Sequence, residues 1–328
     1  MIFPATNENI AHAASLLQRG ELVAFPTETV YGLGADAGNE SATRKIFAVK
    51  QRPFNDPLIV HLAGIHLIEK AARISTTAQA RQIEALKHFW PGPLTVVLPK
   101  QPHIPDVVSA GLPSVAIRIP AHPVALRLLE ESGLPVAAPS ANKFSCVSPT
   151  CAAHVEESFA DSIPAILDGG NCQVGLESTI VSLLEPVSVL LRPGAVTLED
   201  LRSVLGEVRL RNGLTEGDSP ASAPGMMKKH YSPRTPLIIR STGDDSMPVG
   251  KLGLISFRPP VDKESAAKFT ALRVLSESGS LEEVASHLFA ALRELDGLGL
   301  EAIVVDSCPD EGIGLAIMDR LTKAAAPH

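Results

Sequence analysis

Short apolar runs that end at a proline, a glycine or a polar residue recur along the first two thirds of the chain, and this pattern constrains the fold most. It predicts buried strands at the segments ELVAFP, LIVHL, TVVLP, SVAIRIP, PVAAP, AILDGG, STIVSLL and SVLLRPG. Amphipathic spacing between them predicts helices at residues 7–19, 41–49, 75–88 and 122–132. Because helices and strands alternate irregularly, we predict an α/β domain with a twisted mixed sheet rather than a regular doubly wound one.

The composition changes after about residue 212. The stretch GLTEGDSPASAPG is rich in Gly, Ser and Pro and has almost no apolar periodicity, which is typical of a linker. Beyond it, KLGLISF and EAIVVDS predict strands, while SLEEVASHLFAALRELDGLG and residues 314–325 predict helices. We therefore predict a first domain at residues 1–212, a linker at 213–236 and a small Rossmann-like, three-layer α/β/α domain at 237–328.

Composition and charge exclude several classes of protein. Of the 328 residues, 45% are hydrophobic and 20% are charged, so the chain can bury a full core and should be globular. The net charge of -7 argues against broad, sequence-blind binding of nucleic acid. We see no pattern of a membrane span or of a secretion signal. The four cysteines are scattered, so we expect a reduced, cytoplasmic protein with buried thiols and no zinc site.

The segment PTETVYGLG, residues 26–34, is dense in hydroxyl groups and glycine directly after a predicted strand. Loops at the carboxyl ends of strands are the usual ligand-binding places in α/β sheets. The segment can also be an ordinary polar turn in which Gly32 and Gly34 supply unusual backbone angles. The segment alone does not decide between these two interpretations.

Lys50 and Arg52 flank a single residue directly before Pro53 and the apolar run that ends at His61. On extended backbone, residues i and i+2 share a face, so these two cations could hold a phosphate, with the arginine as a planar fork. They could equally form a solvated charged turn. His61 by itself is more often a buried core histidine than a ligand-binding residue.

Small hydroxyl groups and isolated cations recur at other predicted strand ends. These candidates are Arg118, Ser140, Asn142, Ser148, Ser178 and Arg192. The chain has no P-loop, no G-x-G-x-x-G, no H-E-x-x-H and no Ser-His-Asp order. The pattern therefore favours binding of a phosphorylated, polar ligand by many small contacts over chemistry by an activated nucleophile.

Together these motifs resemble the YrdC-type family. PTETVYGLG, the K-x-R of Lys50 and Arg52, DPLIVH, FWPGPLT, the S-x-N of Ser140 and Asn142, SPT, ILDGG, ESTIV and LRPG occur in the order seen in that family, between residues 8 and about 205. PGMMKKHYSPRTPL and GIGLAIMDRLTKAA resemble the long, two-domain form, the threonylcarbamoyl-AMP synthases. The resemblance implies a concave ligand cleft in the first domain and a linker that folds over it as a lid.

The resemblance also implies a reaction. L-Threonine, bicarbonate or CO₂, and ATP give threonylcarbamoyl-AMP and pyrophosphate, which makes the protein a nucleotidyltransferase. Mg²⁺ is expected with the ATP, and no organic prosthetic group is expected. The implied partner is a threonylcarbamoyl-transferase complex that modifies the adenosine beside the tRNA anticodon, with at most a weak RNA contact and no membrane contact.

By position, the family implicates two groups of residues, and we expect Lys50 and Arg52 to be catalytic. The nucleotide group comprises Lys50, Arg52, Asp56, Ser114, Ser140, Asn142, Ser148, Arg192 and Tyr231. The threonine group comprises Thr29, His61, Arg118, the backbone of Ala138, and Ser178. Asp56 departs from the family, in which many members have Asn, so its contact with phosphate or Mg²⁺ is open. We expect no metal ligand from the protein itself.

Two other functions remain possible at this stage. Hydrogenase-maturation factors that transfer carbamoyl groups contain a YrdC-type domain, but they carry cysteine-rich zinc modules, and the scattered cysteines argue against that class. A non-enzymatic RNA-binding module is disfavoured by the acidic balance and by the intact K-x-R and S-x-N pairs.

Overall fold

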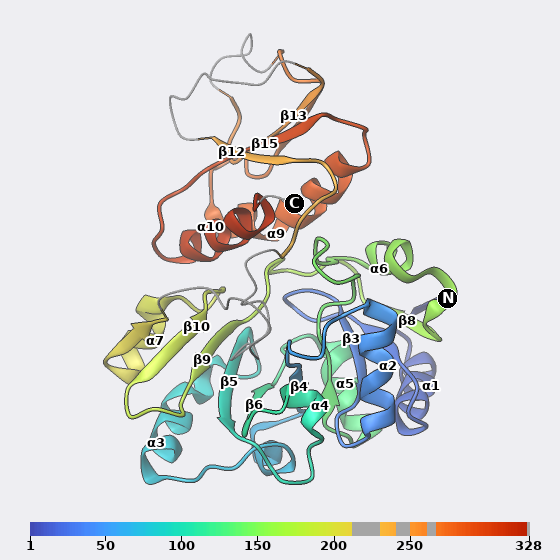
Figure 1. Ribbon diagram of the computed structural model, residues 1–328, viewed down its shortest axis with the longest axis vertical. Helices are drawn as coiled ribbons and strands as arrows, with labels where there is room; N and C mark the ends of the chain where they lie inside the picture. The colour runs from blue at the N-terminus through green and yellow to red at the C-terminus, as the bar shows by residue number, and fades with distance from the viewer. Residues whose placement is uncertain (212–229, 241–249, 261–266, 327–328) are drawn as a thin grey trace.

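The computed structural model describes residues 1–211, 230–240, 250–260 and 267–326 (Figure 1). Two sheets organise them, as expected. The strands of the larger sheet lie within residues 2–210 and those of the smaller sheet within residues 237–306. The domain boundaries themselves stay predictions, because most of the predicted linker, residues 213–229, lies outside the described residues.

Within the described residues the larger sheet has eleven strands. It is a mixed sheet, as predicted. In spatial order the strands are β1 (Ile2–Pro4), β8 (Ala165–Asp168), β2 (Val23–Phe25), β3 (Gly32–Asp36), β7 (Val136–Ala137), β4 (Ile59–His61), β6 (Ser114–Arg118), β5 (Leu94–Pro99), β9 (Thr179–Ser182), β10 (Ser188–Arg192) and β11 (Val208–Leu210). The pairs β2–β3, β3–β7, β4–β7, β5–β6 and β9–β10 are antiparallel, whereas β4–β6 and β5–β9 are parallel.

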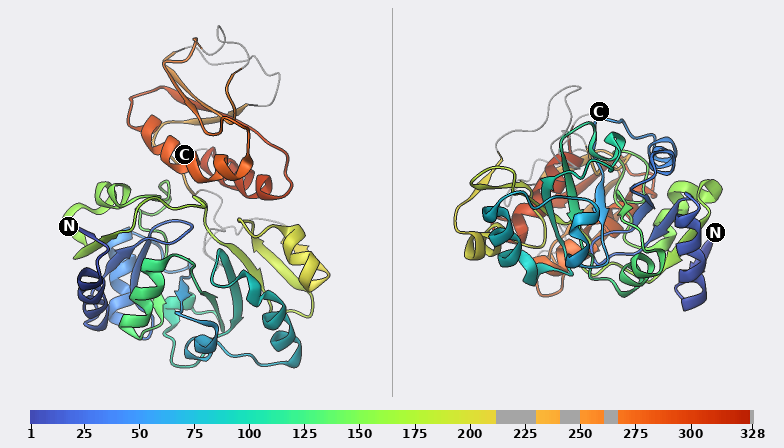
Figure 2. Two further views of the ribbon diagram at one scale, coloured as in Figure 1. Left: turned by 180° about the vertical axis from the view of Figure 1, so that it is seen from behind. Right: turned by 90° about the horizontal axis from the view of Figure 1, so that it is seen from below.

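Helices cover both faces of this sheet. They are α1 (Asn7–Gln18), α2 (Glu40–Lys50), α3 (Thr77–Leu86), α4 (Asp106–Ser109), α5 (Pro123–Ser132), α6 (Ala152–Phe159) and α7 (Leu198–Leu205), with short 3₁₀ turns at Ile65–Lys70, Lys87–Phe89 and Ala160–Ser162. Helices α1 and α5 pack side by side over Val23 and Phe25 (Figure 2). Ala24 points to the opposite core, which α2, α3, α6 and α7 cover, because neighbouring residues of a strand face opposite ways.

The helices begin where side chains can cap them. Thr6 accepts a hydrogen bond from the Asn9 amide at the start of α1. Thr197 and Asp200 form a reciprocal capping box at the start of α7. Sequence analysis did not find α4, α6, α7, β1, β3, β11 or the two outer strands of the smaller sheet.

The smaller sheet is parallel, in the order β12 (Leu237–Arg240), β15 (Ala302–Asp306), β13 (Leu252–Ser256) and β14 (Ala271–Val274). Helices α9 (Leu281–Asp296) and α10 (Ile313–Ala324) both lie between this sheet and the larger domain (Figures 1 and 2). The described residues thus give two layers. The connections that would supply the third predicted layer fall largely within residues 241–249 and 261–266, outside the described residues.

The two domains share one apolar core. Val30, Val147 and Leu176 of the larger domain lie in the same buried cluster as Tyr231 and Phe289. Apolar burial is the main favourable contribution to such contacts, so these side chains help to hold the two domains together.

Two features of the described residues concern the predicted environment of the protein. None of the described helices combines the length and apolar character that a membrane crossing needs. Four cysteines are free, but only Cys172 is buried, and Cys146 is exposed in the loop after β7. The prediction of buried thiols is therefore wrong for Cys146.

The turn interpretation of PTETVYGLG is wrong at its end, because Gly32 and Gly34 lie in strand β3 and neither has a positive φ. The reason for glycine here is close packing. A Cβ on Gly34 would lie 2.8 Å from the Phe25 ring and 2.9 Å from a Val136 methyl group.

We therefore expect Gly34→Ala to lower the free energy of unfolding by about 1–3 kcal/mol, since the tight site must shift to admit a methyl group. The measurement is a urea denaturation series against the wild type. Gly38→Ala is the matched control, because Gly38 is exposed just beyond β3 and its nearest atom would be 3.4 Å away. Equal stability of the two variants would contradict the packing argument.

Candidate active site

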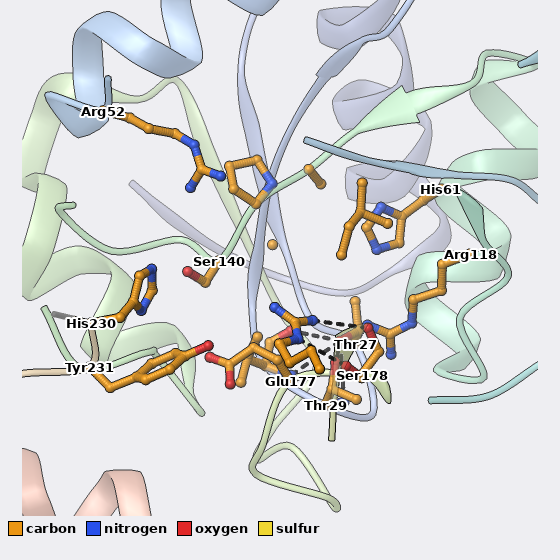
Figure 3. Close-up of a pocket in the computed structure, with 16 residues that line it drawn as sticks. Thr27, Thr29, Arg52, His61, Arg118, Ser140, Glu177, Ser178, His230 and Tyr231 are labelled. Atoms are coloured by element: carbon orange, nitrogen blue, oxygen red, sulfur yellow. Dashed lines mark hydrogen bonds between the residues drawn. The ribbon is translucent and has the colours of Figure 1, made fainter. Parts of the chain in front are cut away.

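A pocket that encloses about 530 Å³ of empty space lies at the strand ends of the larger domain (Figure 3). This volume counts all the space between the lining atoms, open solvent included. The pocket is lined by Thr27, Thr29, Val30, Gly32, Arg52, Ile59, His61, Arg118, Ala138, Pro139, Ser140, Glu177, Ser178, Arg192, His230 and Tyr231. These residues come from eight separate segments of the sequence, so only the folded chain brings them together into a pocket.

The loop between β2 and β3 presents two threonine hydroxyls. Thr27 Oγ1 lies 2.8 Å from Thr29 Oγ1, donates to the Val30 carbonyl oxygen at 2.6 Å, and accepts from the amides of Thr29 and Val30 at 3.2 Å each. Short hydroxyl side chains close such turns by bonding nearby backbone groups. The bonding keeps Thr29 rigid, and sequence analysis selected Thr29 but missed Thr27.

Arg52, Arg118 and Arg192 converge on the pocket from three distant parts of the sequence. Among the described lining residues Glu177 is the single carboxylate, and it is paired with Arg320 of α10 at 2.8 Å. The lining therefore carries an excess of positive charge, which favours an anionic ligand.

Arg52 is fixed by its own loop. It forms an ion pair with Asp56 at 2.8 Å and donates to the carbonyl oxygens of Asp56 and Pro57 at 3.0 and 2.7 Å. Asp56 is fully buried and does not line the pocket. In this structure its carboxylate orients Arg52.

Lys50 and Arg52 do not share a face through extended backbone, and that part of the prediction is wrong. Lys50 is the last residue of α2, and Gln51 caps the helix in the left-handed conformation with φ of 55°. Lys50 is buried, outside the pocket lining, and donates from Nζ to the carbonyl oxygens of Ser140 (2.7 Å) and Asn142. Burial, together with the charge of Arg52, lowers the pKa of Lys50 well below its ordinary value.

At the other end of the pocket, His61 and Arg118 lie close together (Figure 3). Arg118 forms a buried ion pair with Glu28 at 2.7 Å, and the Ala121 amide donates to the second Glu28 oxygen at 3.0 Å. His61 Nδ1 is buried without a hydrogen-bond partner among the described residues. Burial and the Arg118 charge lower the pKa of His61 to about 3, so its ring is neutral at physiological pH.

Ser178 joins the two ends of the pocket. Its hydroxyl lies 2.7 Å from Thr95 Oγ1 and accepts from Arg192 at 3.2 Å, while its carbonyl oxygen accepts from Arg192 Nε at 3.1 Å. These bonds fix Arg192 at the end of β10.

The remaining predicted residues lie outside the lining. Ser148 is buried and donates to Glu177. Asn142 donates to the carbonyl oxygens of Lys143 and Cys146, and so shapes its own loop. Ser114 begins strand β6 and Arg118 ends it, so Ser114 lies at the far end of that strand from the pocket.

His230 and Tyr231, the described end of the predicted linker, close one side of the pocket (Figure 3). Tyr231 is fully buried and stacks on Phe289 of α9, with ring centroids 5.6 Å apart. Burial and the positive charge of Arg52 are the main causes that lower the pKa of His230 well below its ordinary value. Sequence analysis selected Tyr231 but missed its neighbour His230. It also missed Glu177, although that residue stands directly before Ser178.

A mixed α/β domain whose arginine-lined pocket is closed on one side by His230 and Tyr231 is suited to binding a small anionic ligand. A family model described as "Telomere recombination", the Sua5/YciO/YrdC model, matches residues 15–194. A second model, described as the C-terminal domain of threonylcarbamoyl-AMP synthase, matches residues 196–326. The chain belongs to the threonylcarbamoyl-AMP synthase family.

Individual relatives agree with this assignment over nearly the whole chain. Proteins named threonylcarbamoyl-AMP synthase from Pyrococcus abyssi and Bacillus subtilis are each 42% identical to it, over 95% and 98% of this chain and 93% and 94% of their own. The crystal structure of P. abyssi Sua5 complexed with L-threonine superposes with a TM-score of 0.89 and 38% identity, covering 99% of this chain and 97% of that one.

The first prediction from the site concerns Lys50. We expect Lys50→Met to lower the free energy of unfolding by about 1–3 kcal/mol, because two buried carbonyl oxygens lose their donor. Urea denaturation measures the change. Lys45→Met, a more exposed position of the same helix, is the control and should lose less than about 1 kcal/mol. A Lys50→Met variant with wild-type stability but no nucleotide binding would show that Lys50 serves the ligand instead.

The second prediction concerns His61. Its folded pKa of about 3 lies below its unfolded value, so between those values the unfolded state binds the extra proton and stability falls as pH falls. From pH 7 to about pH 5 this one group should remove about 2 kcal/mol. We expect His61→Gln to flatten the pH dependence of the unfolding free energy by that amount. His88→Gln, at an exposed histidine, is the control, and an unchanged slope in His61→Gln would contradict the buried neutral ring.

Proposed function

We propose that this protein makes threonylcarbamoyl-AMP from L-threonine, bicarbonate or CO₂, and MgATP, with release of pyrophosphate. Its membership of the threonylcarbamoyl-AMP synthase family supports this reaction. The observation that carries the proposal is the convergence of Arg52, Arg118 and Arg192 on one pocket, because ATP carries phosphate groups and threonine carries a carboxylate.

The two ends of the pocket suit two different ligands. Arg52, Ser140 and His230 lie at one end, whereas His61 and Arg118 lie at the other (Figure 3). We assign the first end to the phosphates of ATP and the second to threonine. The crystal structure of the related P. abyssi protein with L-threonine supports the second half of this assignment.

On the threonine side, the Arg118 guanidinium is the natural partner of the substrate carboxylate. The Glu28 ion pair uses one edge of the guanidinium and holds it in place. The hydroxyls of Thr29 and Ser178 and the backbone of Ala138 complete the polar contacts.

Magnesium enters with the nucleotide. The two carboxylates nearest the phosphate end are both in ion pairs, Asp56 with Arg52 and Glu177 with Arg320. Among the described residues no group of three or more His, Cys, Asp or Glu side chains is placed to hold a metal. In this proposal the phosphate oxygens of ATP, rather than protein side chains, would bind Mg²⁺.

In the proposed reaction, the threonine amine adds to CO₂ and loses a proton, which gives a carbamate. A carbamate oxygen then attacks the α-phosphorus of ATP as the bond to pyrophosphate breaks. Such phosphoryl-type transfers depend on positioning and charge neutralisation, and Arg52 and Arg192 would provide both. The product would pass to a transferase complex that modifies tRNA beside the anticodon.

Pyrophosphate release in the presence of each substrate combination tests the proposal. We expect release only when threonine, bicarbonate and MgATP are all present, with threonylcarbamoyl-AMP identified by mass spectrometry. Pyrophosphate release that does not depend on threonine or bicarbonate would overturn the proposed reaction.

The assignment of the threonine end is tested by Arg118→Lys, which keeps the charge and loses the planar fork. We expect KM for threonine to rise roughly tenfold, as expected for loss of one good charged hydrogen bond, with a much smaller change in KM for MgATP. Arg127→Lys on the exposed face of α5 is the matched control. A rise confined to KM for MgATP would contradict the assignment.

A further inference from the structure

An arginine of the smaller domain reaches across the domain boundary to the pocket. Arg320 of α10 is 1% exposed. Its Nε donates to the Glu177 carboxylate at 2.8 Å and its Nη2 to the Glu177 carbonyl oxygen at 3.3 Å. Its Nη1 pairs with Asp319 at 2.6 Å. One buried side chain therefore holds both the backbone and the carboxylate of a pocket residue.

Glu177 is an unexpected residue for an anion site. It is the single carboxylate among the described lining residues, and it is buried. Like charges repel strongly where water is excluded, so an uncompensated Glu177 would oppose the binding of phosphate groups. Arg320 supplies the compensating charge, and Ser148 donates a further hydrogen bond to the same carboxylate.

The same arginine also supports the aromatic wall of the pocket. Its guanidinium carbon lies 5.2 Å from the centroid of the Tyr231 ring, which also stacks on Phe289. Tyr231 adopts a positive φ of 63°, and its buried hydroxyl has no hydrogen-bond partner among the described residues. The surrounding contacts, rather than local preference, hold the ring in this position.

We propose that the smaller domain is part of the nucleotide site, with Arg320 as a positioning residue that neutralises Glu177 and holds Tyr231 against the pocket. The proposal rests on the proposed function, because it takes the anion to be a nucleoside triphosphate. It assigns a role to the second domain: without Arg320 the pocket keeps an unpaired carboxylate and loses the support of one wall.

A second arginine at the domain boundary serves as a control, because it contributes to docking of the domains but does not contact Glu177. Arg293 of α9 also crosses the boundary, with Nη2 donating to the Val147 carbonyl oxygen at 2.6 Å and Nη1 pairing with Glu157 at 3.0 Å. None of its recorded bonds reaches Glu177. Loss of Arg293 should weaken docking without changing the charge of the pocket.

The test is a set of five variants: Arg320→Met, Glu177→Gln, the double variant that combines these two changes, Arg293→Met, and Arg293→Met with Glu177→Gln added. The readout is the Kd for α,β-methylene-ATP with Mg²⁺, measured by calorimetry, so that it does not depend on turnover. We expect Arg320→Met to weaken binding by at least roughly tenfold, because it leaves a buried charge unpaired. Adding Glu177→Gln should recover most of that loss, whereas adding it to Arg293→Met should recover none.

The pH dependence of the affinity for the ATP analogue gives a second readout. A purely structural role of Arg320 would not change this pH dependence. Glu177 faces Arg320 of α10, Arg192 of β10, Ser148 and the Tyr231 phenol, while Asp319 pairs with the same Arg320. Burial raises its pKa, but Arg320 and Arg192 more than offset this and keep the pKa below its ordinary value. Without Arg320 the pKa rises, so the carboxyl group protonates as pH falls. Affinity of Arg320→Met should therefore recover as pH falls, relative to the double variant.

The outcomes separate the two proposals. If the wild type binds the analogue but the double variant binds no better than Arg320→Met, the role of Arg320 is refuted while the proposed reaction stands. If the wild type releases no pyrophosphate with threonine and bicarbonate, the proposed function fails first. If Arg320→Met does not fold, the double variant replaces it, because it leaves no unpaired carboxylate at position 177. A Kd of the double variant far above that of Glu177→Gln alone would then refute the proposal that Arg320 acts by neutralising Glu177.

Discussion

Burial of several positive charges beside one pocket is the constraint on which the structure depends. Isolated cations are strongly disfavoured away from water, so each needs a partner. Arg52 has Asp56, Arg118 has Glu28, and Lys50 has two carbonyl oxygens. These contacts also immobilise the cations, so that a bound anion meets groups already in place.

The same constraint ties the second domain to the first. Glu177 needs a partner, and Arg320 provides it from α10. The apolar contacts around this pair continue the connection, since Val30 of the threonine-rich loop and Tyr231 share a core with Phe289. The loop that presents Thr29 is therefore anchored partly by the smaller domain. Docking of the domains therefore also supports the pocket residues Thr29 and Tyr231 from behind.

Sequence patterns predicted most central strands and the longer helices, because these segments are buried on at least one face and show clear periodicity. Strand β3 was missed since its glycines suggested a turn, although the close approach of Phe25 explains them. The short edge strands have too few apolar residues to show a clear pattern. Packing against neighbouring strands, rather than their own sequence, makes them strands. Thr29, Arg118, Ser178 and Arg192 were found as candidates, and the structure brings them to one pocket.

By itself, the sequence determined the class of fold, the change of composition near residue 212 and the family motifs, since these depend on local periodicity and residue order. The tertiary structure decided which polar residues face the pocket and which support it from behind. Lys50 serves backbone carbonyl groups, Asp56 orients Arg52, and Arg320 reaches Glu177 from 143 residues away along the chain. No local pattern records such pairs, because a buried charge is satisfied by whichever group the packed chain brings within a few ångströms.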